Sequence, residues 1–205
     1  MRINNSLFLT FVLMVCLLPM KGWSQNPETP GLRVGEMAPD FTASTYEGHK
    51  IVLSDYYKKG PVVLIFYRGE WCPFCNLHLK SFQNRLKDFK KLGANTLAVS
   101  VDKPEYGTKI VQKDSLGFEV VSDPQADILK SYNVIYKVPD GLAKKYLNEY
   151  HIDLQAHSGR IDHVIAVPAT YVIDRSGRII FAYANVDYKV RTKPEEVLDI
   201  LKNLK

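Results

Sequence analysis

The chain has 205 residues, of which 46% are hydrophobic and 24% are charged, and its formal charge is +5. This ordinary globular composition excludes a largely disordered chain, a collagen-like repeat and a small disulfide-dense scaffold. The lysines and arginines are scattered, so the charge does not form a block of the kind that binds nucleic acid. The three cysteines are more informative: Cys16 stands alone, whereas Cys72 and Cys75 form a Cys-x-x-Cys pair.

The N-terminal segment has the pattern of a secretory signal peptide. Arg2 precedes an apolar run over residues 7–18, which is too short to span a membrane as a helix and fits the apolar core of a signal sequence. The small residues Gly22 and Ser24 mark a cleavage site. We therefore expect residues 1–24 to be a signal peptide and the protein to be exported, periplasmic or extracellular. A retained membrane anchor and lipidation of the cysteine inside the apolar run are less favoured alternatives.

The rest of the chain reads as one domain. Residues 25–32 contain two prolines among polar neighbours, which predicts a flexible lead-in. No repeat, low-complexity stretch or Gly/Ser/Pro-rich linker divides residues 33–205, so we expect a single domain there.

Hydrophobic periodicity predicts the elements in chain order. Strands are expected at residues 41–44, 50–53, 62–66, 96–101, 119–121, 170–173 and 178–183. Helices are expected at residues 73–92, 104–115, 124–132 and 140–150, and near the C-terminus up to residue 204. Asp123 is the expected cap of the third helix, and a capping box over Thr192–Glu195 is expected to open the last. The βαβ half followed by a ββα half predicts an α/β fold with a mixed sheet.

The cysteine pair lies where an apolar strand meets a long helix. Unpaired backbone N–H groups and the helix dipole at that junction stabilise an anion, which favours the reactive thiolate form of Cys72. Arg68 adds positive charge nearby, whereas Glu70 opposes it. Cys75 lies on the buried stripe of the helix, within reach of a disulfide with the first cysteine. We hypothesise that Cys72 attacks and Cys75 resolves.

Two other interpretations of the pair stay open. The cysteines could be small core residues, or they could be half of a zinc site. No second cysteine pair follows, so zinc would need ligands with unusual spacing. Those ligands would come from His78, His151, Asp153, His157 and His163. We expect no metal and no other cofactor, and we expect the histidines after residue 150 to be solvated.

Several segments resemble a known superfamily. Residues 70–75 (Glu-Trp-Cys-Pro-Phe-Cys) after an apolar strand, with residues 167–174 (Val-Pro-Ala-Thr-Tyr-Val-Ile-Asp) later, resemble the thioredoxin fold. The segments 34–41, 122–124 and 173–178 are similar to the peroxiredoxin (alkyl hydroperoxide reductase/thiol-specific antioxidant) branch. Residues 66–76 are similar to its subfamily with a thioredoxin-style cysteine pair. The resemblance covers about residues 33–204 and implies a thioredoxin-like fold with a central mixed sheet flanked by helices.

The resemblance also implies roles for individual residues. Cys72 takes the attacking position and Cys75 the resolving one, with a redox-active disulfide between them. Pro168 takes the place of the proline that faces the cysteine pair in a cis conformation in thioredoxin folds, so we expect a cis bond there. One shallow pocket is expected to contain Cys72 and Arg68, and its wall is expected to comprise Trp71, Pro73, Phe74, Val167 and Pro168.

The chain departs from both relatives at the accessory positions. Peroxiredoxins carry a threonine three residues before the attacking cysteine and an arginine before the aromatic residue of the late strand. Gly69 and Pro168 occupy these positions here. The buried acid that thioredoxin places six residues before its first cysteine corresponds to Phe66. Arg68 is our candidate substitute for the missing arginine.

The resemblance favours an antioxidant enzyme, a thioredoxin-dependent peroxidase reducing hydrogen peroxide or organic hydroperoxides. The alternative is an exported thiol–disulfide oxidoreductase acting on protein disulfides. A binding module that kept the fold without redox cycling is the third hypothesis. The expected partners are a thioredoxin-like electron donor and a peroxide or protein-disulfide substrate, without nucleic acid and without membrane insertion after signal cleavage. Whether residues 140–163 cover the site is left open by the sequence.

Overall fold

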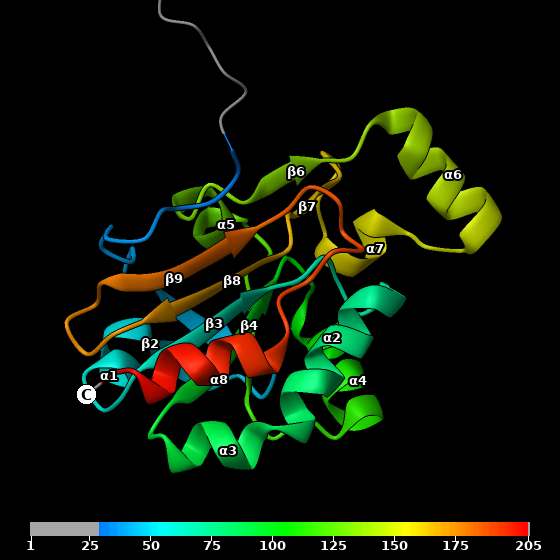
Figure 1. Ribbon diagram of the computed structural model, residues 1–205. Coiled ribbons are helices and arrows are strands. Elements are labelled where there is room, and N and C mark those ends of the chain that lie inside the picture. The colour runs from blue at the N-terminus through cyan, green and yellow to red at the C-terminus, as the bar shows by residue number, and fades with distance from the viewer. Residues whose placement is uncertain (1–28, 205) are drawn as a thin grey trace, which may run out of the picture.

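The computed structural model describes residues 29–204 (Figure 1). The predicted signal peptide, residues 1–24, and Cys16 lie outside this part of the chain. No helix within the described part combines the length and the apolar character needed to cross a membrane.

A mixed sheet forms the centre of the structure, as predicted. Its strands, within the described residues, are β1 (Thr42–Thr45), β2 (Lys50–Val52), β3 (Val62–Phe66), β4 (Asn95–Ser100), β5 (Glu119–Ser122), β8 (Ala169–Ile173) and β9 (Ile179–Ala184). They are arranged in the order β2-β1-β5-β4-β3-β8-β9. β3 and β5 run parallel to β4, and the other neighbouring strands are antiparallel. All five residues of β3 are buried because helices cover both faces of this central strand.

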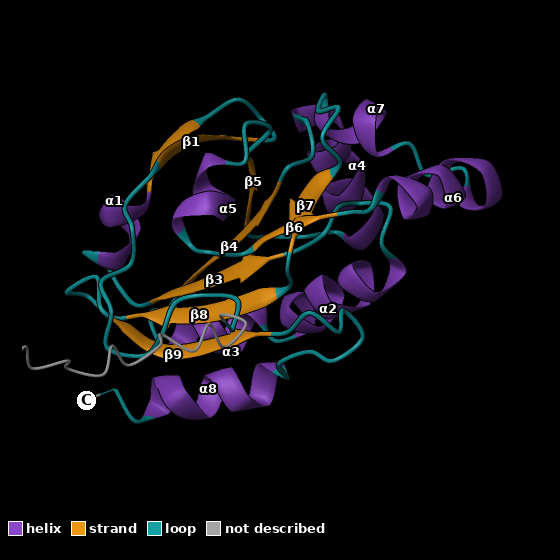
Figure 2. Cartoon of the chain, turned by 90° about the horizontal axis from the view of Figure 1, so that it is seen from above, coloured by secondary structure: helices purple, strands orange, loops and turns teal. Residues whose placement is uncertain are grey.

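Alternate side chains of β3 belong to two separate cores. Val63 and Ile65 pack in the core that contains α2 (Pro73–Asn84), α3 (Leu86–Lys91), α4 (Pro104–Asp114) and α8 (Pro194–Lys202). Leu64 and Phe66 pack in the core that contains α1 (Leu53–Tyr57) and α5 (Asp127–Ser131). Figure 2 shows α2, α3 and α8 on one side of the sheet and α1 and α5 on the other. The period-two pattern of an extended strand therefore builds a three-layer α/β sandwich.

An insertion between α5 and β8 forms a small structure of its own. It contains α6 (Asp140–Tyr150), which the sequence predicts, and α7 (Leu154–Ser158), whose first turn is capped by Asp153. Two short strands that periodicity did not predict, β6 (Ile135–Lys137) and β7 (Val164–Ala166), pair antiparallel at its base. Figure 1 shows α6 projecting from the body at the end of the molecule where α2 begins.

The predicted helix over residues 73–92 is divided into α2 and α3. Arg85, at φ −107° and ψ 8°, leaves the helical conformation and becomes the residue before α3. Its Nε donates to the carboxylate of Asp88 at 2.8 Å, in the first turn of α3. The predicted apolar stripe is nevertheless continuous, because Leu86 and Phe89 remain buried beyond the break.

Two predicted helix starts differ from the structure. Asp123 acts as a cap, and its carboxylate accepts the backbone N–H groups of Asp127 (3.1 Å) and Leu129 (3.0 Å), although α5 begins only at Asp127. The predicted capping box at Thr192 is wrong: α8 begins at Pro194 after an extended Lys193 without a side-chain cap. The buried Thr192 hydroxyl has no hydrogen-bond partner among the described residues.

Candidate functional site

Cys72 is the residue immediately before α2, directly after the loop that leaves β3. Its backbone is extended (φ −91°, ψ 109°), and Pro73 occupies the first helical position, where its missing N–H is not needed. Cys72 is 1% exposed and Cys75, one turn further on, is 0% exposed. Both are free thiols in the structure. The predicted strand–helix junction and the buried position of Cys75 are thus present.

The two thiols have opposite acid–base properties. The thiol of Cys75 donates a hydrogen bond to Cys72, and this lowers the pKa of Cys72 to about 6, from an ordinary value of 9.0. Burial acts against this shift, while the Cys75 amide and the charges of Arg68 and Arg191 add to it. Burial, together with the bond to Cys72, holds the pKa of Cys75 well above its ordinary range. At neutral pH the pair therefore consists of a Cys72 thiolate and a Cys75 thiol.

Arg68 is the cation next to the Cys72 thiolate. Its Nη1 lies 4.0 Å from Cys72 Sγ, and its Nη2 donates to Tyr146 Oη at 2.7 Å. The guanidinium lies over the rings of Tyr188 (4.1 Å) and Trp71 (4.8 Å). None of the ion pairs among the described residues involves Arg68, which is only 6% exposed. A buried cation needs a counter-charge, and the Cys72 thiolate is in position to provide it.

A pocket of about 400 Å³ leads to Cys72. The predicted wall residues Trp71, Pro73 and Phe74 line it, together with Arg68. Its opposite side comes from the insertion and from the loop after β9: Leu142, Lys145, Tyr146, Tyr150, Ile152 and Tyr188. The insertion therefore contributes a wall of this pocket, which answers the question that the sequence left open.

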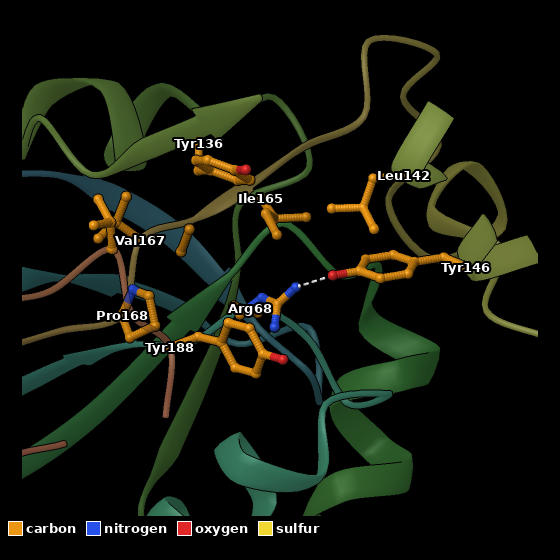
Figure 3. Close-up of a pocket in the computed structure, with 10 residues that line it drawn as sticks. Arg68, Tyr136, Leu142, Tyr146, Ile165, Val167, Pro168 and Tyr188 are labelled. Atoms are coloured by element: carbon orange, nitrogen blue, oxygen red, sulfur yellow. Dashed lines mark hydrogen bonds between the residues drawn. The ribbon is translucent and has the colours of Figure 1, made fainter. Parts of the chain in front are cut away.

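Val167 and Pro168 line a different pocket. This second cavity, about 180 Å³, has Tyr136, Ile165 and Val186 in its apolar wall and shares Arg68, Leu142, Tyr146 and Tyr188 with the first. Figure 3 shows Arg68 bonded to Tyr146, with Tyr188 beside it and Pro168 to its left. The prediction of a single pocket is wrong because Arg68 and its tyrosines lie at a boundary common to two cavities.

The expected cis bond at Pro168 is also absent: all peptide bonds of the described residues are trans. Val167 and Pro168 connect β7 directly to β8. The Val167 N–H donates to Val134 O (2.6 Å), and Pro168 O accepts the N–H of Asn185 (3.1 Å). Both hydrogen bonds form while the Val167–Pro168 peptide is trans, which is the ordinary preference of an X–Pro bond. The unpredicted β6–β7 pairing holds Val167 in this place.

Gly69 explains why the peroxiredoxin threonine is missing. Gly69 is buried at φ +152°, a conformation that side chains disfavour. A Cβ atom there would lie 2.3 Å from Trp71 Nε1 and 3.0 Å from Asp102 Oδ1. The loop therefore has no room for a threonine side chain, and Arg68 and Tyr146 are the polar side chains on this side of Cys72.

Asp102 fixes the loop in front of Cys72. Its Oδ2 accepts the backbone N–H of Glu70 at 2.7 Å, and its Oδ1 lies 3.6 Å from Nδ1 of His157 on α7. The His157 ring stacks on Tyr106 at a centroid distance of 3.8 Å. The expectation that this histidine is solvated is wrong, because its side chain is only 13% exposed.

The histidines do not assemble into a metal site with the cysteines. His78 Nε2 donates to the carbonyl of Thr192 (3.0 Å), and burial lowers its pKa to about 4. His163 lies 3.5 Å from Asp140, far along the chain from the cysteine pair. The described residues contain no group of three or more His, Cys, Asp or Glu side chains placed to hold an ion.

Three site residues were missed by sequence reasoning. Tyr146, on α6, and Tyr188, after β9, enclose Arg68. Arg191 Nη2 lies 3.4 Å from Cys75 Sγ. Each lies at least 78 positions from its partner in the chain, and no local motif marks it. Only the fold brings these side chains to the cysteines.

Comparison with known proteins gives the family. A model of the AhpC/TSA family matches residues 34–182. The chain belongs to the AhpC/TSA family. It is 39% identical over 127 residues to a chloroplastic 2-cysteine peroxiredoxin of Chattonella marina var. antiqua, covering 57% of this chain and 64% of that one. It is 35% identical over 108 residues to the thiol-disulfide oxidoreductase ResA of Geobacillus kaustophilus, covering 52% and 61%.

The fold is confirmed by solved structures. The crystal structure of peroxidoxin BcpB from Mycobacterium tuberculosis superposes with a TM-score of 0.66 at 19% identity, covering 85% of this chain and 99% of that one. These matches confirm the predicted peroxiredoxin-like family and the thioredoxin-like fold. The chain spans under two thirds of the length of the two curated relatives named above.

Proposed function

We propose that the protein reduces hydrogen peroxide or organic hydroperoxides, with Cys72 as the attacking thiolate and Cys75 as the resolving thiol. One observation carries the proposal. The Cys72 sulfur, whose pKa is lowered to about 6, faces a buried Arg68 without a carboxylate partner, at a pocket that opens to solvent. A thiolate and a fixed guanidinium on one side of a cavity suit a substrate that needs both a nucleophile and a donor to its leaving oxygen.

In the first step Cys72 Sγ attacks the terminal oxygen of ROOH. The O–O bond breaks, Cys72 becomes a sulfenic acid, and the leaving RO⁻ takes a proton from solvent. Arg68 stabilises the charge that develops on RO⁻. In the second step the sulfur of Cys75 attacks Cys72 Sγ. A disulfide forms, and the hydroxyl leaves with the Cys75 proton as water.

The disulfide must then be reduced from outside. We propose a thioredoxin-like dithiol protein as the electron donor, because an exchange reaction at the sulfur of Cys72 returns both thiols without a cofactor. We also propose export to an extracytoplasmic compartment. The signal-peptide pattern of residues 1–24 supports this.

The proposal is tested by single-turnover kinetics on the reduced protein. Hydrogen peroxide and an organic hydroperoxide are mixed with the wild type, Cys72→Ser and Cys75→Ser. We expect Cys72→Ser to abolish peroxide consumption and Cys75→Ser to form a sulfenic acid that persists and can be trapped with a 1,3-dione. A Cys72→Ser protein that consumes peroxide at the wild-type rate would overturn the assignment.

A specific observation also favours the second candidate, exchange with protein disulfides. The relative ResA is named a thiol-disulfide oxidoreductase, and the thiolate–thiol pair at the start of α2 suits exchange as well as oxidation. A mixed-disulfide peptide is therefore included in the same experiment. Peroxide oxidation that outpaces peptide exchange by at least about ten-fold supports the peroxidase, which corresponds to ~1.4 kcal/mol in barrier height. The reverse order supports the oxidoreductase.

A further inference from the structure

The sulfur of Cys75 is contacted by a second arginine, Arg191, in addition to Arg68. Cys75 is fully buried on the face of α2 that packs in the core, and its Sγ accepts the backbone N–H of Arg68 at 3.4 Å. The side chain of Arg191 reaches the same sulfur, with Nη2 at 3.4 Å. One guanidinium therefore lies next to each sulfur: that of Arg68 next to Cys72 and that of Arg191 next to Cys75.

Arg191 is held in place by its own segment. Its Nε donates to the carbonyl of Tyr188 at 2.7 Å, and the next residue, Thr192, is tied to α2 by the bond from His78. Arg191 Nη1 is buried and has no hydrogen-bond partner among the described residues. None of the ion pairs within these residues involves Arg191. Its charge is therefore directed at sulfur rather than at a carboxylate.

We propose that Arg191 is a catalytic residue of the resolving step, which stabilises Cys75 as a thiolate when it attacks the oxidised Cys72. The proposal deepens the proposed function, on which its kinetic part rests. Cys75 alone is a poor nucleophile at neutral pH, because burial holds its pKa well above the ordinary range. A fixed cation at hydrogen-bond distance is the physical means of lowering the cost of forming the anion there.

The same contact serves both halves of the cycle. During resolution Cys75 loses its proton, its sulfur attacks Cys72 Sγ, and the sulfenic hydroxyl leaves as water. During reduction a thiolate of the dithiol donor attacks Cys72 Sγ, the disulfide breaks, and Cys75 leaves as a thiolate next to Arg191. A leaving thiol with a lower pKa departs faster, so stabilising this anion accelerates the second reaction as well.

Other charged or titratable groups face this sulfur and must be held constant in any test. They are Cys72 immediately before α2, His78 on α2, and Tyr67 and Arg68 from the segment after β3. Burial raises the pKa of Tyr67, and burial followed by the charge of Arg191 lowers that of His78. Both groups are therefore neutral between about pH 6 and 9, which leaves the two arginines and Cys72 as the charges that act.

The first experiment needs no peroxide. Thiolate formation at Cys75 is followed by ultraviolet absorbance against pH in Cys72→Ser, with Cys72→Ser/Cys75→Ser subtracted so that Cys16 and the tyrosines cancel. Adding Arg191→Gln is expected to raise the midpoint of Cys75 ionisation by about one pH unit or more, since an opposite charge within about 4–6 Å shifts a pKa by about 1–3 units. Adding Lys189→Gln, which removes an exposed cation from the same segment, is expected to shift it by less than about 0.3 units.

The second experiment separates the two steps in the protein with both cysteines. With peroxide, Arg191→Gln is expected to oxidise Cys72 within about three-fold of the wild-type rate, because the charge of Arg191 lowers the pKa of Cys72 less than Cys75 and Arg68 do. Disulfide formation is expected to slow by about 3- to 30-fold, since the loss of thiolate is partly offset by the higher nucleophilicity of a more basic sulfur. Longer-lived sulfenic acid, trapped with a 1,3-dione, reports the same change.

Arg191→Lys distinguishes a charge effect from a structural one. It keeps the charge without the bond to Tyr188, so it is expected to restore most of the Cys75 midpoint if charge is what matters. An unchanged midpoint in Arg191→Gln, or a lysine variant as defective as the glutamine variant, would overturn the role of Arg191. Failure of peroxide to oxidise Cys72 in the wild type would overturn the proposed function and leave the thiolate result standing.

Discussion

Cys72 and Cys75 are three residues apart at the start of one helix, yet their surroundings drive their acidities in opposite directions. The pKa of Cys72 is lowered to about 6, whereas that of Cys75 is held well above its ordinary range. Cys72 immediately precedes α2 and Cys75 lies in its first turn, so both are near the same helix dipole and the dipole does not account for the difference. The difference comes from what each sulfur faces.

Cys72 faces a pocket, and Cys75 faces the core. The Cys72 sulfur accepts the hydrogen bond from the Cys75 thiol and lies next to Arg68, so the Cys72 anion is stabilised. The Cys75 sulfur lies on the buried stripe with Leu79 and Phe82, where desolvation penalises an anion. A Cys-x-x-Cys motif thus becomes directional when one of its thiols is buried and the other borders a cavity.

Arg68→Gln is expected to have the largest effect on this asymmetry. Its loss removes both the cation next to the Cys72 thiolate and the donor for the leaving oxygen, so peroxide oxidation of Cys72 should fall by about 100-fold. Stopped-flow measurement of Cys72 oxidation checks this. Arg68→Lys is the matched control: it keeps the charge but not the stacking on Tyr188 and Trp71, and it should recover only part of the rate. A glutamine variant as fast as wild type would show that Arg68 plays no part in the chemistry.

The second prediction concerns pH. Because the reactive form is the anion and its pKa lies at about 6, the oxidation rate should be level above about pH 7. Well below that pKa it should fall about ten-fold for each pH unit, since each unit there removes about nine tenths of the remaining thiolate. Initial rates with hydrogen peroxide between pH 4.5 and 8.5 measure the profile. In Arg68→Gln the midpoint should move upward, and a midpoint near the ordinary thiol value in the wild type would contradict the asymmetry.

The difference between the sulfurs was predictable in part. The apolar run of β3 and the helical stripe of α2 placed Cys72 at a strand–helix junction and Cys75 in the core, because both patterns are local. Arg68 was found for the same reason, four residues before Cys72. Tyr146 and Arg191 were not, since they come from segments 78 and 116 residues away from their partners.

The errors at Pro168 have a single physical origin. The short strands β6 and β7 carry no clear periodicity, yet their pairing holds Val167 on Val134 and directs the Val167–Pro168 segment toward the second pocket. A resemblance to a fold predicts the strand that follows Pro168. It does not predict how an insertion before that strand changes which residues line the pocket at Cys72. The missing threonine, in contrast, was visible in the sequence, and its cause is the space that Trp71 and Asp102 occupy around Gly69.

Tyr146→Phe is expected to have the smallest effect of the three, and it tests whether the insertion tunes the Cys72 side alone. The substitution removes the 2.7 Å bond to Arg68 and keeps the ring that lines the pocket. A hydrogen bond to a charged group contributes about 1.5–3 kcal/mol, but Tyr188 and Trp71 still hold the guanidinium, so we expect a loss of only about three- to ten-fold in Cys72 oxidation. Tyr46→Phe, which removes a tyrosine hydroxyl outside both pockets, is the matched control and should leave the rate unchanged. The rate of disulfide formation should not change in either variant, because neither tyrosine contacts Cys75. If Tyr146→Phe slowed resolution as much as oxidation, the division of the site into an Arg68 side and an Arg191 side would be wrong.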